Sequence, residues 1–202
     1  MKIALIGATG QAGSEILKEL VARGHAVTAI VRNPDRVPAL PHVTARQGDA
    51  GDVAGLAALL AGHDAVISAV LFTTSDPSKL IEAVRRSGVP RYLVVGGAGS
   101  LEVAPGLRLL DAPGFPEEYR PEATGGAAFL DLLRGETVLD WSFLSPSLMF
   151  IPGPRTGSFR LGGDQLLSTP EGSSISFADY AIAMVDEVER PAHSRQRFTV
   201  GY

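Results

Sequence analysis

The chain has 202 residues, 45% of them hydrophobic and 20% charged, with a formal net charge of −4, which is typical of one globular domain with a full core. Charged residues are spread without blocks, which argues against a nucleic-acid-binding surface, and the absence of cysteine excludes disulfides, thiolate metal sites and cysteine nucleophiles. No apolar run is long enough to cross a membrane and no secretion signal precedes the first predicted strand, so we expect a cytoplasmic protein.

The first predicted strand, residues 2–6, leads into a glycine motif, GATGQAG at 7–13, after which apolar residues recur at helical spacing. In a dinucleotide-binding loop the first glycine makes the turn, the second admits the pyrophosphate, and the third lets the helix approach the sheet. The phosphates then lie at a helix N-terminus, where free N–H groups favour negative charge. The alternative is a tight turn without a ligand. The predicted cofactor-binding residues of this loop are Gly7, Thr9, Gly10, Gln11, Ala12 and Gly13.

The second predicted strand, residues 26–31, ends at Arg32. An NAD-selective site usually has Asp or Glu at this point, about 20 residues past the glycines, to bind the ribose 2′-hydroxyl. A guanidinium instead binds a 2′-phosphate through charge-assisted hydrogen bonds, so Arg32 favours NADP(H) over NAD(H). The alternatives are that Arg32 is a solvated loop cation, or that it stacks on adenine whichever cofactor is bound.

The next two strands end at the edge of the sheet where ligands of such folds bind. After the strand at 43–47, Asp49 could accept a hydrogen bond from the adenine amino group, or it could only stabilise its own turn. The strand at 65–70 ends in small residues, where the backbone could pass under the ribose and nicotinamide. From these two strand ends we assign to the cofactor site Asp49, Ala50, Ala69 and Val70.

Strands and helices continue to alternate along the chain. The further elements are helices predicted over 53–60, 77–87, 122–133 and 177–188, and strands over 91–95, 141–144 and 197–200. Residues 101–121 are proline-rich and irregular, and a loop of this length in a compact domain is usually functional. Residues 158–161 and 164–167 predict a β-hairpin, and Ser176 with Asp179 predicts a capping box at the last helix.

This alternation predicts an α/β fold, a doubly wound Rossmann-type parallel sheet with a small C-terminal hairpin and helix. No linker or repeat divides the sequence, so we predict a single NAD(P)-binding domain over residues 1–202. The substrate-side elements are expected mainly from 101–125 and 146–180. Four histidines occur, none at metal-ligand spacing, so no metal site is predicted.

Several stretches are similar to one protein family. They are GATGQAG at 7–13, VRNP at 31–34, GDAGD at 48–52, VVGGAGSL at 94–101, EEYRPEA at 117–123, DWSFLSPS at 140–147, TGSFRLGGDQLL at 156–167 and the final RQRFTVGY. Nearly the whole chain thereby resembles the atypical short-chain dehydrogenase/reductase superfamily, and within it the NmrA-like NAD(P)H-flavin reductases related to biliverdin reductase B. The resemblance implies a nicotinamide dinucleotide as cofactor and a flavin as a candidate substrate.

The resemblance also implies further site residues, with Ser100 and Tyr119 as the catalytic candidates. Ser100 lies where the superfamily has its active-site serine, and it would orient a substrate carbonyl or the nicotinamide carboxamide, or only bind its own glycine turn. Tyr119 would stack on a ring or line the pocket, or pack over the sheet as a loop residue. Pro146 resembles the family's backbone contact with nicotinamide. Three phenylalanines are candidates for an apolar platform or for the core: Phe72, Phe115 and Phe150.

One departure from the superfamily bears on the chemistry. Members of the short-chain dehydrogenase type use a Tyr-x-x-x-Lys pair in proton transfer, but here Ala123 stands four residues after Tyr119. The adjacent Arg120 does not replace the lysine, because arginine does not deprotonate. Alcohol–ketone chemistry is therefore disfavoured, whereas flavin reduction needs no such pair, because solvent can supply the proton.

We therefore expect an NADPH-dependent oxidoreductase that transfers hydride to a flat conjugated acceptor such as a flavin or a quinone. Its partner is a small aromatic molecule, not nucleic acid or a membrane, and we expect a monomer or a homodimer. The alternative is an NmrA-like dinucleotide-binding redox sensor with little catalysis. A third hypothesis is an isomerase or dehydratase that keeps its nicotinamide bound, although the short C-terminal half leaves little room for a large sugar nucleotide.

Overall fold

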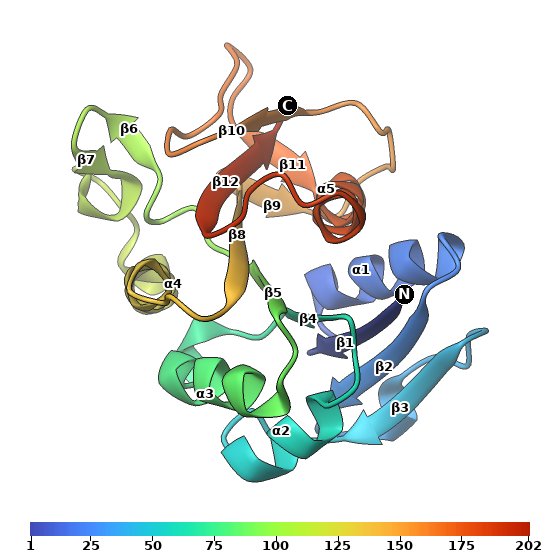
Figure 1. Cartoon of the computed structure of the whole chain (residues 1–202). Coiled ribbons are helices and arrows are strands. Elements are labelled where there is room, and N and C mark those ends of the chain that lie inside the picture. Colours follow the sequence, from blue (N-terminus) through green and yellow to red (C-terminus); the bar gives the residue numbers. More distant parts are fainter.

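The computed structural model describes residues 1–202 and contains an eight-stranded sheet with helices on both faces (Figure 1). The strand order is β3-β2-β1-β4-β5-β8-β12-β10, and all neighbours are parallel except β12 and β10. The strands are β1 (Lys2–Ile6), β2 (Ala26–Val31), β3 (Val43–Gln47), β4 (Ala65–Ser68), β5 (Arg91–Val95), β8 (Asp140–Pro146), β10 (Arg160–Gly162) and β12 (Gln196–Gly201). The helices are α1 (Gln11–Ala22), α2 (Val53–Leu60), α3 (Pro77–Ser87), α4 (Arg120–Arg134) and α5 (Phe177–Glu189). No helix is both long enough and apolar enough to cross a membrane.

Each face of the sheet has its own hydrophobic core, because successive residues of a strand point to opposite sides. In β1, Ile3 and Leu5 belong to the core that α1 and α5 cover. Ala4 and Ile6 belong to the core on the other face, which α2, α3 and α4 cover. Helices on both faces of a mainly parallel sheet confirm the predicted doubly wound α/β fold.

Most element bounds agree with the sequence patterns, and local capping explains several of them. At the start of α2, Asp52 Oδ1 accepts a hydrogen bond from the Gly55 N–H at 3.0 Å, and Asp76 caps α3 in the same way. The strand predicted over 65–70 ends two residues early, at Ser68; the Ala69 N–H still donates a hydrogen bond to the Ile6 carbonyl at 2.8 Å, and the Ala69 carbonyl lies against Gly7. The remaining differences are extensions of one or two residues at the ends of α4, α5, β8 and β12.

The antiparallel pairing near the C-terminus exists, but its partners differ from the prediction. Residues 158–161 and 164–167 form no hairpin. Instead β10 pairs with the end of β12, and Gln165 forms an isolated bridge with Glu102. The strand predicted at 158–161 is present as β10, but the sequence carried no information about its partner. By pairing with β12, β10 covers what would otherwise be an open sheet edge.

Two further segments have more order than the sequence predicted. Within residues 101–121, β6 (Glu102–Ala104) and β7 (Leu107–Arg108) form a short antiparallel pair, and 3₁₀ turns follow. After β8, a second small sheet joins β9 (Met149–Ile151) to β11 (Ser174–Ser176). Both segments lie on the side where we expected substrate.

The capping box at α5 is only half present. Ser176 Oγ accepts a hydrogen bond from the Asp179 N–H at 3.0 Å, as predicted. The Asp179 carboxylate does not return the contact; it accepts hydrogen bonds from the N–H groups of Thr156 and Gly157 and from the Tyr202 hydroxyl. Burial alone would raise the pKa of Asp179, but these hydrogen bonds outweigh it and hold the pKa below its usual value. Asp179 therefore fastens the 154–158 loop and the C-terminus to α5.

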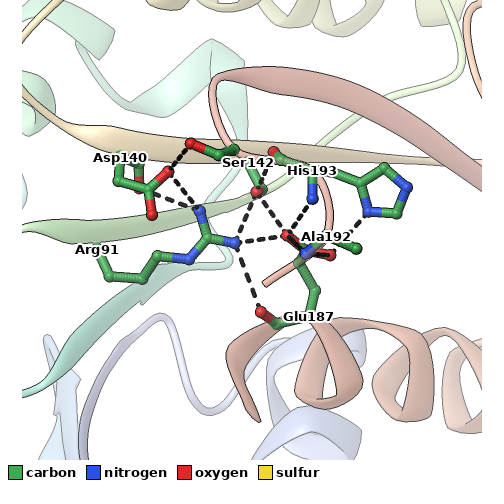
Figure 2. A network of polar contacts seen from close by, with 7 residues as sticks. Arg91, Asp140, Ser142, Glu187, Ala192 and His193 are labelled. Atoms are coloured by element: carbon green, nitrogen blue, oxygen red, sulfur yellow. Dashed lines mark hydrogen bonds and ion pairs between the residues drawn. The ribbon is translucent and has the colours of Figure 1, made fainter. Parts of the chain in front are cut away.

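The amino ends of β5 and β8, opposite the glycine loop, are joined by a buried ionic network (Figure 2). Its centre is Glu187 of α5, of which only 3% is exposed. Glu187 Oε1 accepts hydrogen bonds from Arg91 Nη2 at 2.6 Å and from Ser142 Oγ at 3.0 Å. Arg91 is buried as well, and it also contacts Asp140 at the start of β8. The network thus ties α5 to two strands of the sheet.

The same carboxylate also holds the segment that leads into β12. Glu187 accepts hydrogen bonds from the N–H groups of Ala192 and His193 and from His193 Nδ1, the last at 2.7 Å. The His193 ring stacks on Phe198 of β12, with ring centroids 4.0 Å apart. Burial alone would raise the pKa of Glu187, but the hydrogen bonds from His193 and Ala192 and the charge of Arg91 together hold it below its usual value.

Glu187→Gln should lower the free energy of unfolding by about 3 kcal/mol at pH 7, because it leaves the buried Arg91 without its main counter-charge. The pKa of Glu187 is lower in the folded chain, so its stabilisation is present above the unfolded-state pKa of about 4.3 and is lost as pH falls through the folded pKa. Urea unfolding from pH 7 to pH 3 should therefore show the gap between wild type and variant narrowing in acid. The exposed Glu118→Gln should change stability by less than about 0.5 kcal/mol; a gap that stays constant with pH would contradict the assignment.

Candidate functional site

Two cavities lie where the parallel strands of the sheet end, and both have the size of small-molecule pockets. The first, here called the polar cavity, has a volume of about 600 Å³ and follows the ends of β1, β2, β3 and β4. The second, the apolar cavity, has a volume of about 640 Å³ and lies beyond β5. Eight of the predicted cofactor residues line the polar cavity: Gly7, Thr9, Gly10, Arg32, Asp49, Ala50, Ala69 and Val70.

The three glycines of the loop have different structural reasons to be glycine. Gly7 has a φ of +85°, and a Cβ there would lie 2.3 Å from the Ala69 carbonyl oxygen. A Cβ on Gly13 would lie 2.1 Å from the Gly7 carbonyl oxygen. Gly10 has an ordinary φ of −76°, and its Cβ would meet nothing closer than 3.5 Å. The protein itself therefore leaves room at Gly10, the position where a dinucleotide loop admits the pyrophosphate.

The N-terminus of α1 suits an anion for a second reason. Gly10 is its N-cap and supplies no side-chain hydrogen bond, and its first turn has no acidic residue. The helices α2, α3 and α5, by contrast, are capped by Asp52, Asp76 and Ser176. The first N–H groups of α1, on Gln11 and the residues after it, are thus open to a phosphate, which the helix dipole also favours. The residues present therefore fit a dinucleotide.

Arg32 lines the polar cavity together with a second arginine, Arg36, which the sequence analysis did not assign. A 3₁₀ turn at Pro34–Arg36 brings Arg36 back towards the cavity, and this turn is fixed by a hydrogen bond from the Asp35 N–H to Asn33 Oδ1 at 3.1 Å. Both arginines are exposed, and neither guanidinium forms an ion pair or hydrogen bond within the chain. The turn sequence N-P-D-R was the signal that could have identified Arg36.

Asp49 has the turn-stabilising role considered for it, and it also lines the polar cavity. Its Oδ1 accepts a hydrogen bond from the Gly51 N–H at 2.8 Å, which stabilises the turn after β3. The same side chain lines the polar cavity, and its Oδ2 has no hydrogen-bond partner within the chain. That oxygen is therefore available to a donor on a ligand.

The apolar cavity is formed mainly by the segments expected on the substrate side. Residues 109–123 and 148–151 supply most of its lining, and Gly97 to Gly99 at the end of β5 complete it. Four aromatic side chains face it: Phe72, Phe115, Tyr119 and Phe150. The Tyr119 side chain is 62% exposed, so it lies at the opening and is not packed over the sheet.

A single turn after β4 separates the two cavities. Leu71, Thr74 and Ser75 line the polar cavity, whereas Phe72 lines the apolar one. Glu122 of α4 fixes this turn, because its carboxylate accepts hydrogen bonds from the N–H groups of Phe72 at 2.8 Å and Thr73 at 2.9 Å. Molecules bound in the two cavities would therefore lie next to each other beside a turn that α4 holds in place.

The Phe72 ring depends on two consecutive glycines in the same helix. A Cβ on Gly125 or on Gly126 would approach Phe72 to 2.8 Å. The ring also stacks on Phe143 and meets the edge of Phe129. Phe72 thus belongs both to the cavity wall and to the core, which joins the two roles considered for it.

Two residues assigned by resemblance are not among the residues that line the two cavities. Ser100 is buried, and its Oγ accepts a hydrogen bond from Arg197 Nη1 at 3.4 Å. Pro146 is buried at the end of β8, opposite Val200 of β12. Neither lines a cavity, so we do not include Ser100 or Pro146 among the contacts proposed below.

Known proteins similar to this chain match it from end to end. The sequence pattern of a family described as NAD(P)H-binding matches residues 7–191. The Bacillus subtilis (strain 168) protein named "Uncharacterized protein YwnB" is 43% identical over 208 residues, covering 99% of this chain and 98% of its own. A solved structure from Bacteroides thetaiotaomicron, named a "putative epimerase", is 42% identical with a TM-score of 0.94 and covers 100% of this chain and 96% of its own. The solved structure of SP1627 of Streptococcus pneumoniae TIGR4, named a "putative NADH-flavin reductase", is 42% identical with a TM-score of 0.87. The match covers 100% of this chain and 99% of that one.

Gly10→Ser should separate ligand binding from folding. The serine hydroxyl can cap the open N–H groups of α1, so the free energy of unfolding should stay constant or rise by a few tenths of a kcal/mol. The same hydroxyl would occupy the place of the pyrophosphate, so the Kd for a nicotinamide dinucleotide should rise at least about tenfold. Calorimetric titration and thermal unfolding measure the two effects.

Gly13→Ala serves as the comparison for the stability measurement. Its Cβ would clash with the Gly7 backbone, so this variant should lower the free energy of unfolding by about 2 kcal/mol, whereas Gly10→Ser should not. If Gly10→Ser bound the dinucleotide as tightly as wild type, the loop would not be the phosphate site.

Proposed function

We propose that this chain, which belongs to the NAD(P)H-binding family, is an NADPH-dependent oxidoreductase that transfers hydride to a flat conjugated acceptor such as a flavin or a quinone. The family membership confirms the resemblance that its motifs indicated. The observation that carries the proposal is the pair of adjoining cavities. One offers an open helix N-terminus and free arginines, the other offers aromatic walls, and only the turn at residues 71–75 lies between them. Such a site can hold two different molecules next to each other.

The preference for NADPH rests on Arg32 and Arg36. Two unpaired guanidiniums beside the end of β2 can bind a 2′-phosphate, and no acidic residue stands directly after β2 to hold a 2′-hydroxyl. Asp49 on the other side of the same cavity could accept a hydrogen bond from adenine. We propose that these three residues bind the adenosine half of the cofactor, and that the reaction takes place in the cytoplasm.

When bound, NADPH supplies the hydride, and the chain supplies position and an environment. The turn fixed by Glu122 lies beside both reactants and would help to position them. The aromatic walls, Phe115 and Phe150 among them, hold a flat ring and exclude water from much of its surface. Tyr119 at the opening can stack on that ring. No lysine or histidine lines the apolar cavity, so the acceptor takes its proton from solvent, as reduced flavins and quinones can.

Names of relatives support different reactions, and the side chains favour reduction over epimerisation. One solved relative is named a "putative NADH-flavin reductase" and another a "putative epimerase". An epimerase must remove and return a proton at carbon, or oxidise and reduce an alcohol, and both routes need a positioned acid or base. The carboxylate of Glu122 is occupied by two backbone N–H groups, and Ala123 stands where a partner lysine for Tyr119 would be.

A second candidate is a dinucleotide-binding redox sensor with little catalysis. The same shortage of acid and base groups near Tyr119 favours it, since a sensor needs only to bind the dinucleotide. The two candidates differ in turnover, which one experiment can measure. NADPH consumption at about 340 nm should be followed with riboflavin, FMN and a quinone as acceptors. Turnover supports the reductase; a dinucleotide-dependent rise in melting temperature without turnover would favour the sensor instead.

Arg32→Ala and Arg36→Ala should each raise the KM for NADPH about tenfold or more, and should leave the KM for NADH within about twofold. The reason is that a charge-assisted hydrogen bond to the 2′-phosphate is worth about 1.5–3 kcal/mol, and NADH has no such group. Arg46→Ala in β3 is the control, because Arg46 is exposed and does not line the cavity. Equal losses with both dinucleotides would contradict the assigned 2′-phosphate contact.

A further inference from the structure

The charged residues of the two cavities differ in net sign. The polar cavity is lined by two arginines whose side chains have no partner in the chain, Arg32 and Arg36, and by one carboxylate, Asp49, which leaves a net positive charge. The apolar cavity is lined by seventeen residues, and lysine, arginine and histidine are absent from them. Its one charged side chain is Glu122. An anion entering the apolar cavity would therefore meet a carboxylate and no cation.

Glu122 cannot turn away from the cavity to avoid an anion. Both of its carboxylate oxygens are engaged, one by the Phe72 N–H and the other by the Thr73 N–H. These contacts fix a formal negative charge at the wall that the two cavities share. Rotating the side chain away would release the turn on which that wall depends.

The guanidiniums close to the apolar cavity are already paired. Arg120 lies over the Phe115 ring, 5.5 Å from its centroid, but it donates hydrogen bonds to both carboxylate oxygens of Glu117, the shortest at 2.7 Å. Arg108 likewise pairs with Asp111 at 2.6 Å. Each of these guanidiniums is balanced by a neighbouring carboxylate, so the two pairs add no net positive charge beside the cavity. Moving an anion into an apolar site without a partner costs free energy.

We propose that the apolar cavity selects conjugated acceptors without negative charge over phosphorylated flavins. Uncharged quinones and riboflavin should therefore be preferred to FMN. The inference rests on the proposed reductase function. In the proposed reaction NADPH gives a hydride to the acceptor and water gives a proton. The acceptor gains two electrons and two protons in total, and NADPH becomes NADP⁺. The charges of the two cavities thus sort the reactants: the phosphates of the dinucleotide bind at Arg32 and Arg36, and the uncharged ring binds beside Glu122.

Direct binding tests the selection without turnover. Quenching of flavin fluorescence by the full chain, in the presence of NADP⁺, gives Kd values for riboflavin and FMN, which share the same ring and differ by one phosphate. We expect riboflavin to bind at least about tenfold more tightly than FMN. A second pair, 1,4-naphthoquinone and its 2-sulfonate, should show the same order in kcat/KM for NADPH oxidation.

A charge-inserting variant tests whether charge, and not size, is the cause. Leu148 lines the cavity and is 50% exposed, so a longer side chain can point to solvent. Leu148→Lys should tighten FMN binding about fivefold relative to riboflavin, which is the value of a partly exposed ion pair. Leu148→Gln is the uncharged control and should keep the wild-type ratio of the two Kd values.

The outcomes separate this inference from the proposed function. Equal Kd values for riboflavin and FMN in the wild type, with NADPH oxidised by both, would overturn the charge selection and leave the reductase intact. A preference for riboflavin that Leu148→Lys does not reduce would also overturn it, since size would then be the cause. If no flavin or quinone bound and none was reduced, the reductase function itself would fail, and the inference with it.

Discussion

The site depends on a sequence of backbone contacts that only glycine permits. The carbonyl oxygen of Ala69 lies 2.3 Å from where a Cβ of Gly7 would be, and the carbonyl oxygen of Gly7 lies 2.1 Å from where a Cβ of Gly13 would be. These two contacts bring the end of β4, the loop after β1 and the first turn of α1 together. The N-terminus of α1 is consequently held at the edge of the sheet with its N–H groups uncapped. Without that close approach, neither the polar cavity nor its position beside the apolar cavity would exist.

The amino and carboxyl ends of the strands differ in how their charged and polar groups are paired. At the amino ends of β5 and β8, the buried charges are paired with each other: Glu187 accepts hydrogen bonds from Arg91, Ser142 and the 192–193 backbone, and only Arg91 Nε lacks a partner. At the carboxyl ends, Arg32 and Arg36 have no partners and α1 has no side-chain cap. Satisfied polar groups rigidify and stabilise a fold, while unsatisfied ones mark the places where a ligand completes the structure. The stability gained at the amino ends allows the carboxyl ends to keep unpaired groups that are free to bind a ligand.

Much of the dinucleotide side could be predicted from the sequence, because its signals are local. The glycine spacing, the strand before it and the helix after it lie within about twenty residues, and Arg32 follows directly from the end of β2. What could not be predicted are the contacts between segments far apart in the chain, which leave no periodic trace. The pairing of β10 with β12, and the hydrogen bonds from Phe72 and Thr73 to Glu122, are of this kind. The prediction for Ser100 came from resemblance alone, and the hydrogen bond between Ser100 and Arg197 is another contact of this kind.

The linings of the two cavities come from different parts of the chain. Every residue of the polar cavity lies between residues 6 and 75, whereas the apolar cavity takes all of its lining except Phe72 from residues 97–151. Substitutions that reshape the acceptor pocket can therefore accumulate in the second half of the chain without disturbing the dinucleotide half. Evolution of a new reaction would then need only new walls around an unchanged hydride source. Two solved relatives that are about equally similar to this chain over its full length bear the names of different enzymes.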